Sequence, residues 1–327
     1  MLNKEALFYT KDGETTDCFL CPHHCRIRPG NVGICGVRRN VGGTLYTENY
    51  GKLTAYNLDP VEKKPLYHFH PGKRILSVGS YGCNLKCSFC QNYAIAHGRP
   101  RFVYMLPEEL ADKAVSIEGN IGIAYTYNEP SIWYEYVLET ARAVKEVGLS
   151  NVLVTNGFIE GQALEDLLPY IDAMNIDIKS FKESYYKDIC KGKLAPVLDT
   201  AERAVPKCHV EITTLVVGGL NDDMEEIAEL GSWISAISGD IPVHLSRYYP
   251  AYKMDRPPTP VEILIKAREV LQQFLNYVYI GNIPNVDNST HCPSCGARII
   301  ERNGYISRPR LDSGTCYKCG RIINMII

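Results

Sequence analysis

Residues 79–93 read GSYGCNLKCSFCQNY and place Cys83, Cys87 and Cys90 in a C-x3-C-x2-C spacing. Three thiolates on one short loop can hold three corners of a cubic iron–sulfur cluster. Clusters that only transfer electrons take four cysteines. A centre with one open position can instead bind a substrate or cofactor directly, as a catalytic zinc does. Because the residues between these cysteines are mostly polar and turn-forming, the stretch favours a liganding loop over three buried free thiols.

The composition is that of an ordinary globular protein. The chain has 327 residues, of which 22% are charged and 45% hydrophobic, and its net charge is −2. This length allows one large α/β domain or two smaller ones. The charge gives no global case for nucleic acid or an acidic membrane, no run approaches the roughly 18 apolar residues of a membrane span, and the N-terminus turns polar too quickly for a signal peptide. We therefore expect a cytoplasmic protein.

Cysteine usage points to metal binding. Of the 13 cysteines, all but Cys190 and Cys208 fall into three spaced groups. Without an export signal, such groups indicate metal ligation in a reducing compartment and not disulfides. A cluster with an open iron is also oxygen-labile, so an anaerobic or oxygen-poor setting is expected.

The first group precedes the cluster loop and has the spacing C-x2-C-x3-C-x9-C, formed by Cys18, Cys21, Cys25 and Cys35. Four cysteines suit a closed zinc site or a second iron–sulfur cluster, and the spacing does not choose between them. His23 and His24 lie inside this run. Either could replace a cysteine, although exposed loop residues are the simpler interpretation.

The last group is typical of a zinc ribbon. It has the spacing C-x2-C-x20-C-x2-C with a glycine after each pair, and its members are Cys292, Cys295, Cys316 and Cys319. A module this short has no room for a core, so metal binding would supply its folding free energy, on the order of 10 kcal/mol. From His291 onward six Lys or Arg face two Asp or Glu. This charge permits nucleic-acid binding, but a structural or partner-docking ribbon is the preferred interpretation.

Between these groups, short apolar runs alternate with amphipathic segments, which predicts a parallel sheet. The expected strands are 74–79, 121–126, 151–155, 173–178, 210–217, 241–246 and 277–280. The expected helices are 107–117, 131–147, 161–170, 199–205, 224–238 and 260–274. Right-handed crossovers could curl such βα units into a partial (β/α)6-type barrel.

This order predicts three regions. Residues 1–72 would form a cysteine-rich extension and connector, 73–285 the partial barrel, and 286–327 the ribbon-like module. Residues 44–57 are expected to contain a small β segment. The connector 60–72 either passes the active site, where Lys63, Lys64, His68 and His70 could meet a substrate, or is a solvated linker.

Polar residues follow the expected strands at the edge where barrels of this kind hold their chemistry. The strand-end sequences are TYNEP at 126–130 with its preceding tyrosine, TNG at 155–157, NIDIKS at 175–180, VVGGLN at 216–221, VHLSRYYP at 243–250 and YIGN at 279–282. Asp177 and Lys179 lie on the same side of one strand. Any one of these loops is a weak signal, whereas six in succession indicate a site.

Taken in order, the motifs GCNLKCSFCQNY, TYNEP, VTNG, NIDIKS, HLSRYYP and YIGN resemble the pyruvate formate-lyase activating enzyme group of the radical S-adenosylmethionine (SAM) superfamily. With its outer cysteine groups, the chain is most similar to the radical SAM member of the AmmeMemoRadiSam system. The resemblance spans essentially the whole chain. It implies a [4Fe–4S] cluster whose open iron chelates SAM, and reductive cleavage to a 5′-deoxyadenosyl radical that abstracts hydrogen.

The resemblance also implies roles for single residues. Asn128 and Glu129 would hold the SAM amino group. Its ribose and carboxylate would meet Thr155, Asn156, Asp177 and Lys179, with His244 beside the ribose. The adenine would lie near Gly219, Asn221, Gly281 and Asn282. A low-potential donor such as flavodoxin or ferredoxin would supply the electron.

One departure matters for the substrate. Activating enzymes carry the three-cysteine loop near the N-terminus, whereas about 80 residues precede it here. The target is therefore open between a peptide and a small molecule. A glycyl-radical activase is one alternative, and a metal-binding adaptor or nucleic-acid-binding protein is another.

Overall fold

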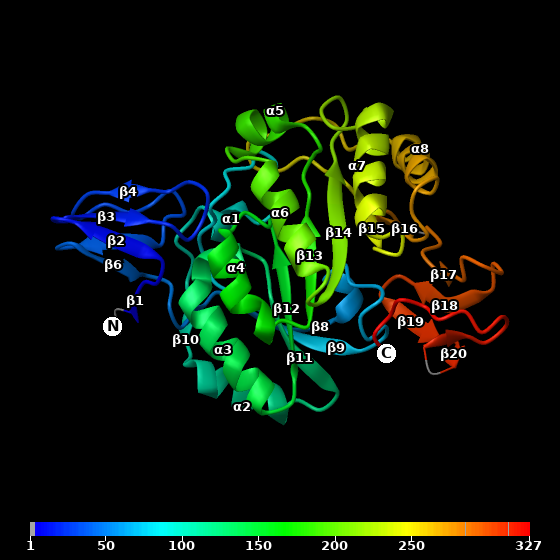
Figure 1. Ribbon diagram of the computed structural model, residues 1–327, viewed down its shortest axis with the longest axis horizontal. Helices are drawn as coiled ribbons and strands as arrows, with labels where there is room; N and C mark the ends of the chain where they lie inside the picture. Colours follow the sequence, from blue (N-terminus) through cyan, green and yellow to red (C-terminus); the bar gives the residue numbers. More distant parts are fainter. Residues whose placement is uncertain (1–3, 285, 313) are drawn as a thin grey trace.

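The computed structural model describes residues 4–284, 286–312 and 314–327. Its centre is an eight-stranded sheet in the order β16-β15-β14-β13-β12-β11-β9-β8 (Figure 1). All neighbouring pairs are parallel except β8 with β9. The strands are β8 Ala55–Pro60, β9 Arg74–Gly79, β11 Asn120–Tyr125, β12 Ser150–Thr155, β13 Ala173–Asp177, β14 His209–Val216, β15 Val243–Arg247 and β16 Val278–Gly281. The expected mostly parallel α/β sheet is confirmed.

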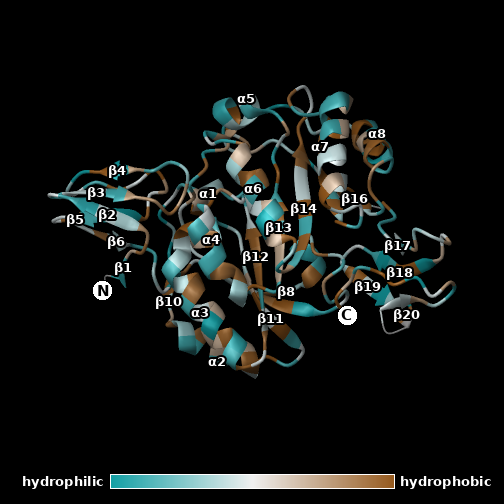
Figure 2. Cartoon of the chain, viewed as in Figure 1, coloured by the Kyte–Doolittle hydropathy of each residue, from teal (hydrophilic) through white to brown (hydrophobic). Residues whose placement is uncertain are grey.

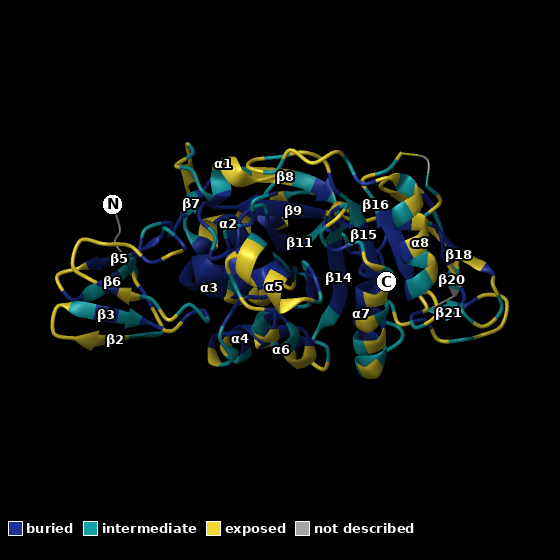
Figure 3. Cartoon of the chain, turned by 90° about the horizontal axis from the view of Figure 1, so that it is seen from above, coloured by how far each residue is buried: buried dark blue, intermediate teal, exposed yellow. Residues whose placement is uncertain are grey.

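The seven parallel strands match the sequence-based strands to within two residues at each end. Their apolar, β-branched residues are buried because helices cover the sheet. Figure 3 shows the strands as a buried centre, with exposed surface on the outer helices. The eighth strand, β8, has the polar sequence AYNLDP and lies at the sheet edge, where little of it is buried. For this reason its hydrophobic pattern is weak, and the β segment expected at 44–57 includes only its first three residues.

Helices connect the strands as the amphipathic pattern predicts. They are α2 Pro107–Ser116, α3 Tyr134–Glu146, α4 Gly161–Leu167, α6 Ala195–Ala204, α7 Met224–Ile237 and α8 Val261–Leu271. In Figure 2, strands β11 and β12 are largely hydrophobic whereas α2 and α3 alternate between hydrophobic and hydrophilic. Helix α6 begins four residues before the expected Asp199, with Pro196 in its first turn. None of the described helices is long and apolar enough to cross a bilayer.

The N-terminal segment forms two small sheets at one end of the molecule (Figure 1). One contains β2 Tyr9–Asp12, β3 Thr15–Cys18 and β4 Arg26–Ile27, and the other β1 Lys4–Glu5, β6 Thr44–Thr47 and β5 Arg38–Val41. β7 Lys52–Leu53 pairs with β10 Val103–Tyr104. Buried Arg38 forms an ion pair with buried Glu135 of α3, and this carboxylate also accepts the N–H of Leu7 at 2.7 Å. The module is thereby fixed to the barrel.

The C-terminal segment lies at the opposite end. It contains the antiparallel strands β17 Thr290–His291, β18 Arg298–Asn303 and β19 Ile306–Pro309, followed by the pair β20 Leu311–Asp312 and β21 Thr315–Cys316. The chain end returns to the connector. The N–H of His70 donates to the carbonyl of Ile326 at 2.6 Å, and the N–H of Ile326 donates to the carbonyl of His68 at 2.9 Å. The connector is therefore packed against the tail and is not a solvated linker.

Candidate active site

The three-cysteine loop joins β9 to the short helix α1 Tyr93–Ala96. Cys83, Cys87 and Cys90 all line one cavity of about 260 Å³. Gly82 precedes them with φ +94°, and a Cβ there would lie 2.6 Å from Cγ1 of Val37 and 2.9 Å from the carbonyl of Cys35. The glycine thus lets the loop pass directly against the N-terminal module.

Asparagine side chains hold this loop. The Asn128 amide oxygen accepts the N–H of Ser80 at 2.8 Å, and its Nδ2 donates to the carbonyl of Gly82 at 3.3 Å. Asn156 Nδ2 donates to Oδ1 of Asn84 at 2.9 Å and lies 3.7 Å from the sulfur of Cys83. Asn128 therefore lines the cavity but uses its amide to fix the loop.

Glu129 is buried beside the cysteines and accepts three hydrogen bonds. They come from Thr155 Oγ1 at 2.6 Å, the N–H of Ser131 at 2.9 Å and the N–H of Asn156 at 2.8 Å. Burial raises the pKa of this carboxyl, and the donors oppose that shift. A carboxylate has about four acceptor sites, so one remains for a further donor.

Asp177 and Lys179 lie at the end of β13 and face the same cavity. Lys179 Nζ is 2.7 Å from Asp177 Oδ2, and the lysine is largely buried. Burial disfavours the ammonium, but the Asp177 carboxylate outweighs this effect, so the pKa of Lys179 is raised. The pair therefore places a cation and an anion in the wall of the cavity that the three thiols also line.

Of the residues that the resemblance assigned to SAM, the structure brings seven to this cavity. They are Asn128, Glu129, Thr155, Asn156, Asp177, Lys179 and Asn282. Gly219, Asn221, His244 and Gly281 are not among its described lining residues. Asn221 instead donates to the carbonyls of Lys179 and Leu215 and accepts the N–H of Val217. It joins two strand ends, and both N–H donors of its side chain are used in doing so.

His244 and Gly281 line a second cavity, of about 950 Å³. Three residues, Thr213, Ser246 and Asn282, line both cavities, so the two adjoin. His244 Nε2 lies 2.6 Å from Oε2 of buried Glu211, whose other oxygen is 3.0 Å from Nε2 of His209. Burial favours the neutral acid, but both histidines outweigh it and lower the pKa of Glu211.

Sequence reasoning missed Glu211, although it had a signal. A single carboxylate in the apolar strand β14 is unexpected unless it is paired. Of the connector residues, Lys63 lines the larger cavity, whereas Lys64 is buried 2.8 Å from Asp59. His68 is buried, with Nε2 2.8 Å from the Tyr279 hydroxyl and Nδ1 3.0 Å from the carbonyl of Asn324. These contacts occupy Lys64 and His68.

The N-terminal cysteines share one small cavity with Arg38 and Ile132, where all four of Cys18, Cys21, Cys25 and Cys35 are found. His23 does not join them: its Nε2 lies 2.7 Å from the carbonyl of Asn84 in the three-cysteine loop. His24 Nε2 lies 2.8 Å from Glu160. The histidines thus contact the barrel.

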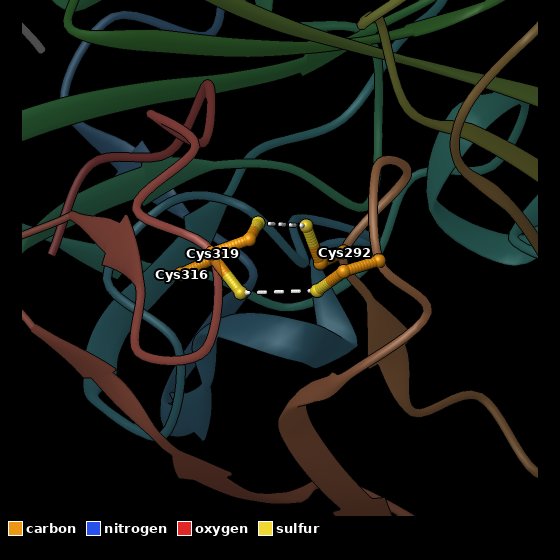
Figure 4. Close-up of side chains that lie close together, drawn as sticks. Cys292, Cys316 and Cys319 are labelled. Atoms are coloured by element: carbon orange, nitrogen blue, oxygen red, sulfur yellow. Dashed lines mark hydrogen bonds between the residues drawn. The ribbon is translucent and has the colours of Figure 1, made fainter.

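The tail cysteines have the tightest arrangement. Within the described residues, they alone form a group of three or more Cys, His or acidic side chains whose ligand atoms all lie within 4.8 Å of one another. Figure 4 shows the sulfurs of the two pairs facing each other, with Cys292 3.6 Å from Cys319 and Cys295 3.7 Å from Cys316. Four thiolates at about 2.3 Å from a tetrahedral zinc would be about 3.8 Å apart. This group can hold a metal ion.

Comparison with known proteins gives a consistent result. The family model described as the radical SAM superfamily matches residues 77–232. The chain is 40% identical to the uncharacterized protein MJ0808 of Methanocaldococcus jannaschii, over 99% of this chain and 100% of that protein. It is 28% identical to the pyruvate formate-lyase-activating enzyme of Clostridium pasteurianum, over 55% of this chain and 76% of that enzyme. Streptococcus suis SuiB bound to S-adenosylmethionine has a similar fold, with a TM-score of 0.52 and 16% identity over 69% of this chain and 53% of SuiB.

Proposed function

The chain belongs to the radical SAM superfamily, and on this premise we propose that it is an oxidoreductase that reductively cleaves SAM and abstracts hydrogen from a peptide or small molecule. A bound [4Fe–4S] cluster and SAM would supply the one-electron chemistry, with Cys83, Cys87 and Cys90 as the residues that would hold the cluster. One observation carries the proposal. The three thiols of one loop open onto the same cavity as a buried carboxylate and a buried, carboxylate-bound ammonium group.

The residues present fit a three-ligand cluster. Cys83, Cys87 and Cys90 would be its ligands. Asn156 places an N–H donor beside the sulfur of Cys83, which stabilises a thiolate. Asn128 holds the backbone immediately before the first cysteine, so contacts within the protein help to position the loop.

The residues also fit an amino-acid zwitterion with a ribose. Glu129 keeps one acceptor site for an ammonium group. Lys179 offers a cation for a carboxylate, with Asp177 holding its direction. Thr155, Asn156 and Asn282 add polar groups to the wall. We leave Gly219, Asn221, His244 and Gly281 out of this proposed SAM site.

The outer groups complete the proposal. We assign zinc to the tail cysteines from their tetrahedral spacing, and either zinc or a second cluster to the N-terminal four. We further propose a reducing cytoplasm, since none of the 13 cysteines, all of which the structure describes, forms a disulfide. The oxygen-poor setting is proposed because a cluster with an open iron is oxygen-labile. A flavodoxin or ferredoxin would deliver the electron.

The test uses full-length protein purified without oxygen. We expect about four irons in the cluster loop, an EPR spectrum of the reduced state that changes when SAM is added, and 5′-deoxyadenosine on addition of dithionite. Cys87→Ser should lose the SAM-sensitive signal and the product. Cys208→Ser is the matched control, because this thiol is not among the residues that line the three-cysteine cavity and donates to the carbonyl of Ala204 at 3.6 Å. If protein purified entirely without oxygen contains zinc but no iron, the proposal is overturned.

A glycyl-radical activase is the second candidate, favoured by the similarity to an activating enzyme over 55% of this chain. It would differ by producing a glycyl EPR signal in a partner protein. The metal-binding adaptor remains a third outcome. It predicts nucleic-acid binding at physiological salt that survives Cys83→Ser but not Cys292→Ser.

A further inference from the structure

The N-terminal module brings four cysteines from two stretches of chain around one space. The N–H of Cys18 donates to the carbonyl of Cys25 at 2.9 Å, which holds the first stretch in a tight loop. None of the four, all of which the structure describes, forms a disulfide, and three of them are buried. The four that line the space, called here the N-terminal four, are Cys18, Cys21, Cys25 and Cys35. Such a set of soft thiol ligands suits either zinc or an iron–sulfur cluster.

The sulfur atoms of the N-terminal four are too far apart for a closed zinc site. Thiolates about 2.3 Å from a tetrahedral zinc lie about 3.8 Å from one another. The tail cysteines approach this spacing, with sulfurs 3.6 and 3.7 Å apart. Within the part of the chain that the structure describes, the tail group alone has three or more ligand atoms all within 4.8 Å of one another. No three sulfurs of the N-terminal four therefore meet that limit.

The space between these sulfurs supports the same conclusion. It measures about 10 Å³, which is close to what one water molecule needs. Thiols drawn to about 2.3 Å from one ion would leave no such space between them. A [4Fe–4S] cluster instead places its own irons and sulfides between the four thiolates, which holds them farther apart.

The three-cysteine loop shares this wide spacing. The sulfurs of Cys83, Cys87 and Cys90 line one cavity, yet they too do not all lie within 4.8 Å of one another. The chain therefore has two cysteine groups with wide spacing and one with the close spacing of a single ion. The N-terminal four resemble the proposed cluster loop and not the tail.

Neighbouring residues fit a cluster at this position. Arg38, which is 1% exposed, directs an Nη1 N–H group at the sulfur of Cys18 over 3.8 Å. A cationic donor of this kind stabilises a thiolate. Gly33 also lines the space, and a Cβ there would lie 3.6 Å from the sulfur of Cys25. The glycine therefore leaves room beside this ligand.

The N-terminal four lie against the three-cysteine loop. A Cβ on Gly82, the residue before Cys83, would be 2.9 Å from the carbonyl oxygen of Cys35. On the other side, His23 Nε2 lies 2.7 Å from the carbonyl of Asn84, the residue after Cys83. The two cysteine groups are thus separated by little more than one layer of backbone, and centres held by them would be close neighbours.

We propose that the N-terminal four hold a second [4Fe–4S] cluster, and that this cluster passes electrons to the three-cysteine site. A reduced flavodoxin or ferredoxin would give up one electron to the second cluster. That cluster would return to its oxidised state as the electron moves on, and no atom or proton is transferred. The electron relay rests on the proposed function, whereas the identity of the N-terminal metal centre does not.

Metal analysis of full-length protein purified without oxygen tests the second cluster. We expect about eight irons and one zinc per chain. The double variant Cys21→Ser with Cys25→Ser should lose about four irons, and should keep its zinc and the SAM-sensitive EPR signal. Cys208→Ser, at a thiol outside all three cysteine groups, is the matched control and should lose no metal.

A reciprocal variant covers the case in which the double variant does not fold. Protein with Cys83, Cys87 and Cys90 all changed to serine should retain about four irons. Its EPR spectrum should not respond to SAM, because these irons would have no open position.

Two measurements test the relay. EPR spectra of the fully reduced wild type should show magnetic coupling between two neighbouring clusters, and the double variant should lose it. Formation of 5′-deoxyadenosine with reduced flavodoxin should be at least tenfold slower in the double variant. With dithionite the double variant should still form the product, because this small reductant can reach the three-cysteine cavity directly.

The outcomes separate the proposals. About four irons with two zincs in the wild type, or loss of zinc in place of iron in the double variant, would overturn the second cluster even if 5′-deoxyadenosine is formed. Uncoupled spectra, or equal rates with flavodoxin, would overturn the relay. Wild-type protein that holds about eight irons but forms no 5′-deoxyadenosine would overturn the proposed function and leave the second cluster standing.

Discussion

At the scale of the residue, Glu129 shows how a catalytic candidate is also a structural one. Its two oxygens accept from Thr155, Ser131 and Asn156, and so join the segments that follow β11 and β12. The carboxylate therefore fixes the geometry of the site as well as offering a free acceptor position. Any test of its role in binding must measure stability too.

We predict that Glu129→Gln destabilises the protein by about 2 kcal/mol. Both Glu129 oxygens accept hydrogen bonds, and in the variant an NH2 group replaces one of them, so at least one donor loses its acceptor. Chemical denaturation monitored by circular dichroism measures the loss. Glu118 is an exposed carboxylate in the loop that follows α2, and Glu118→Gln should leave the free energy of unfolding unchanged. Equal stability of the two variants would contradict the bonding described for Glu129.

His68 makes the fold sensitive to acid. Burial lowers the pKa of this imidazole to about 3 from the ordinary 6.5. The folded-state value lies below the unfolded one, so the stabilisation is complete above pH 6.5 and is lost as the pH falls from about 6.5 toward 3. We expect the free energy of unfolding to drop over this range in the wild type, and the drop to be smaller in His68→Gln. If the free energy of unfolding falls equally with pH in the wild type and in His68→Gln, other groups cause the sensitivity to acid.

At the scale of the element, the N-terminal module is held to α3 by the buried pair of Arg38 and Glu135, each 1% exposed. Removing one partner leaves the other charge buried and uncompensated. Arg38→Met should therefore cost about 3–5 kcal/mol of stability, measured by denaturation, and Arg38→Met with Glu135→Leu should recover most of it. The exposed pair of Arg26 and Asp12 is the control, and Arg26→Ala should have no measurable effect. If the double variant is no more stable than Arg38→Met alone, the pairing of Arg38 with Glu135 is contradicted.

The elements also show where sequence reasoning ends. β14 was predictable over its whole length because its buried run is rich in β-branched residues. β8 was predicted only in part, since the expected β segment 44–57 stops before Leu58, because an edge strand shows little burial pattern. Helix α6 starts before Asp199 because Pro196 fits a first helical turn, which the amphipathic pattern alone does not register. Periodicity thus detects burial, and elements with little burial escape it.

At the scale of the whole molecule, we expect the fold of the tail to depend on a metal ion held by its four cysteines. We predict that Cys292→Ser removes one zinc per chain and exposes the tail arginines to trypsin, since the ribbon's free energy of folding comes largely from metal binding. Iron at the three-cysteine loop should be unchanged, because the two sites share no residue. Lys318→Ala, between Cys316 and Cys319, is the matched control. Metal analysis with limited proteolysis gives the result, and iron in place of zinc would contradict the zinc assignment.

Local spacing and periodic burial were enough to predict the three-cysteine loop, the seven parallel strands and the tail cysteine group. It also predicted seven SAM-site candidates that meet at one cavity, since parallel strands bring their ends to a single edge. The N-terminal metal and the three-region division remain predictions. The three-dimensional fold was needed to show that Asn221 joins strands, that His244 pairs with Glu211 in a second cavity, and that Arg302 of the tail donates to the carbonyl of Tyr67. These facts depend on contacts between residues far apart in the chain, which no local pattern records.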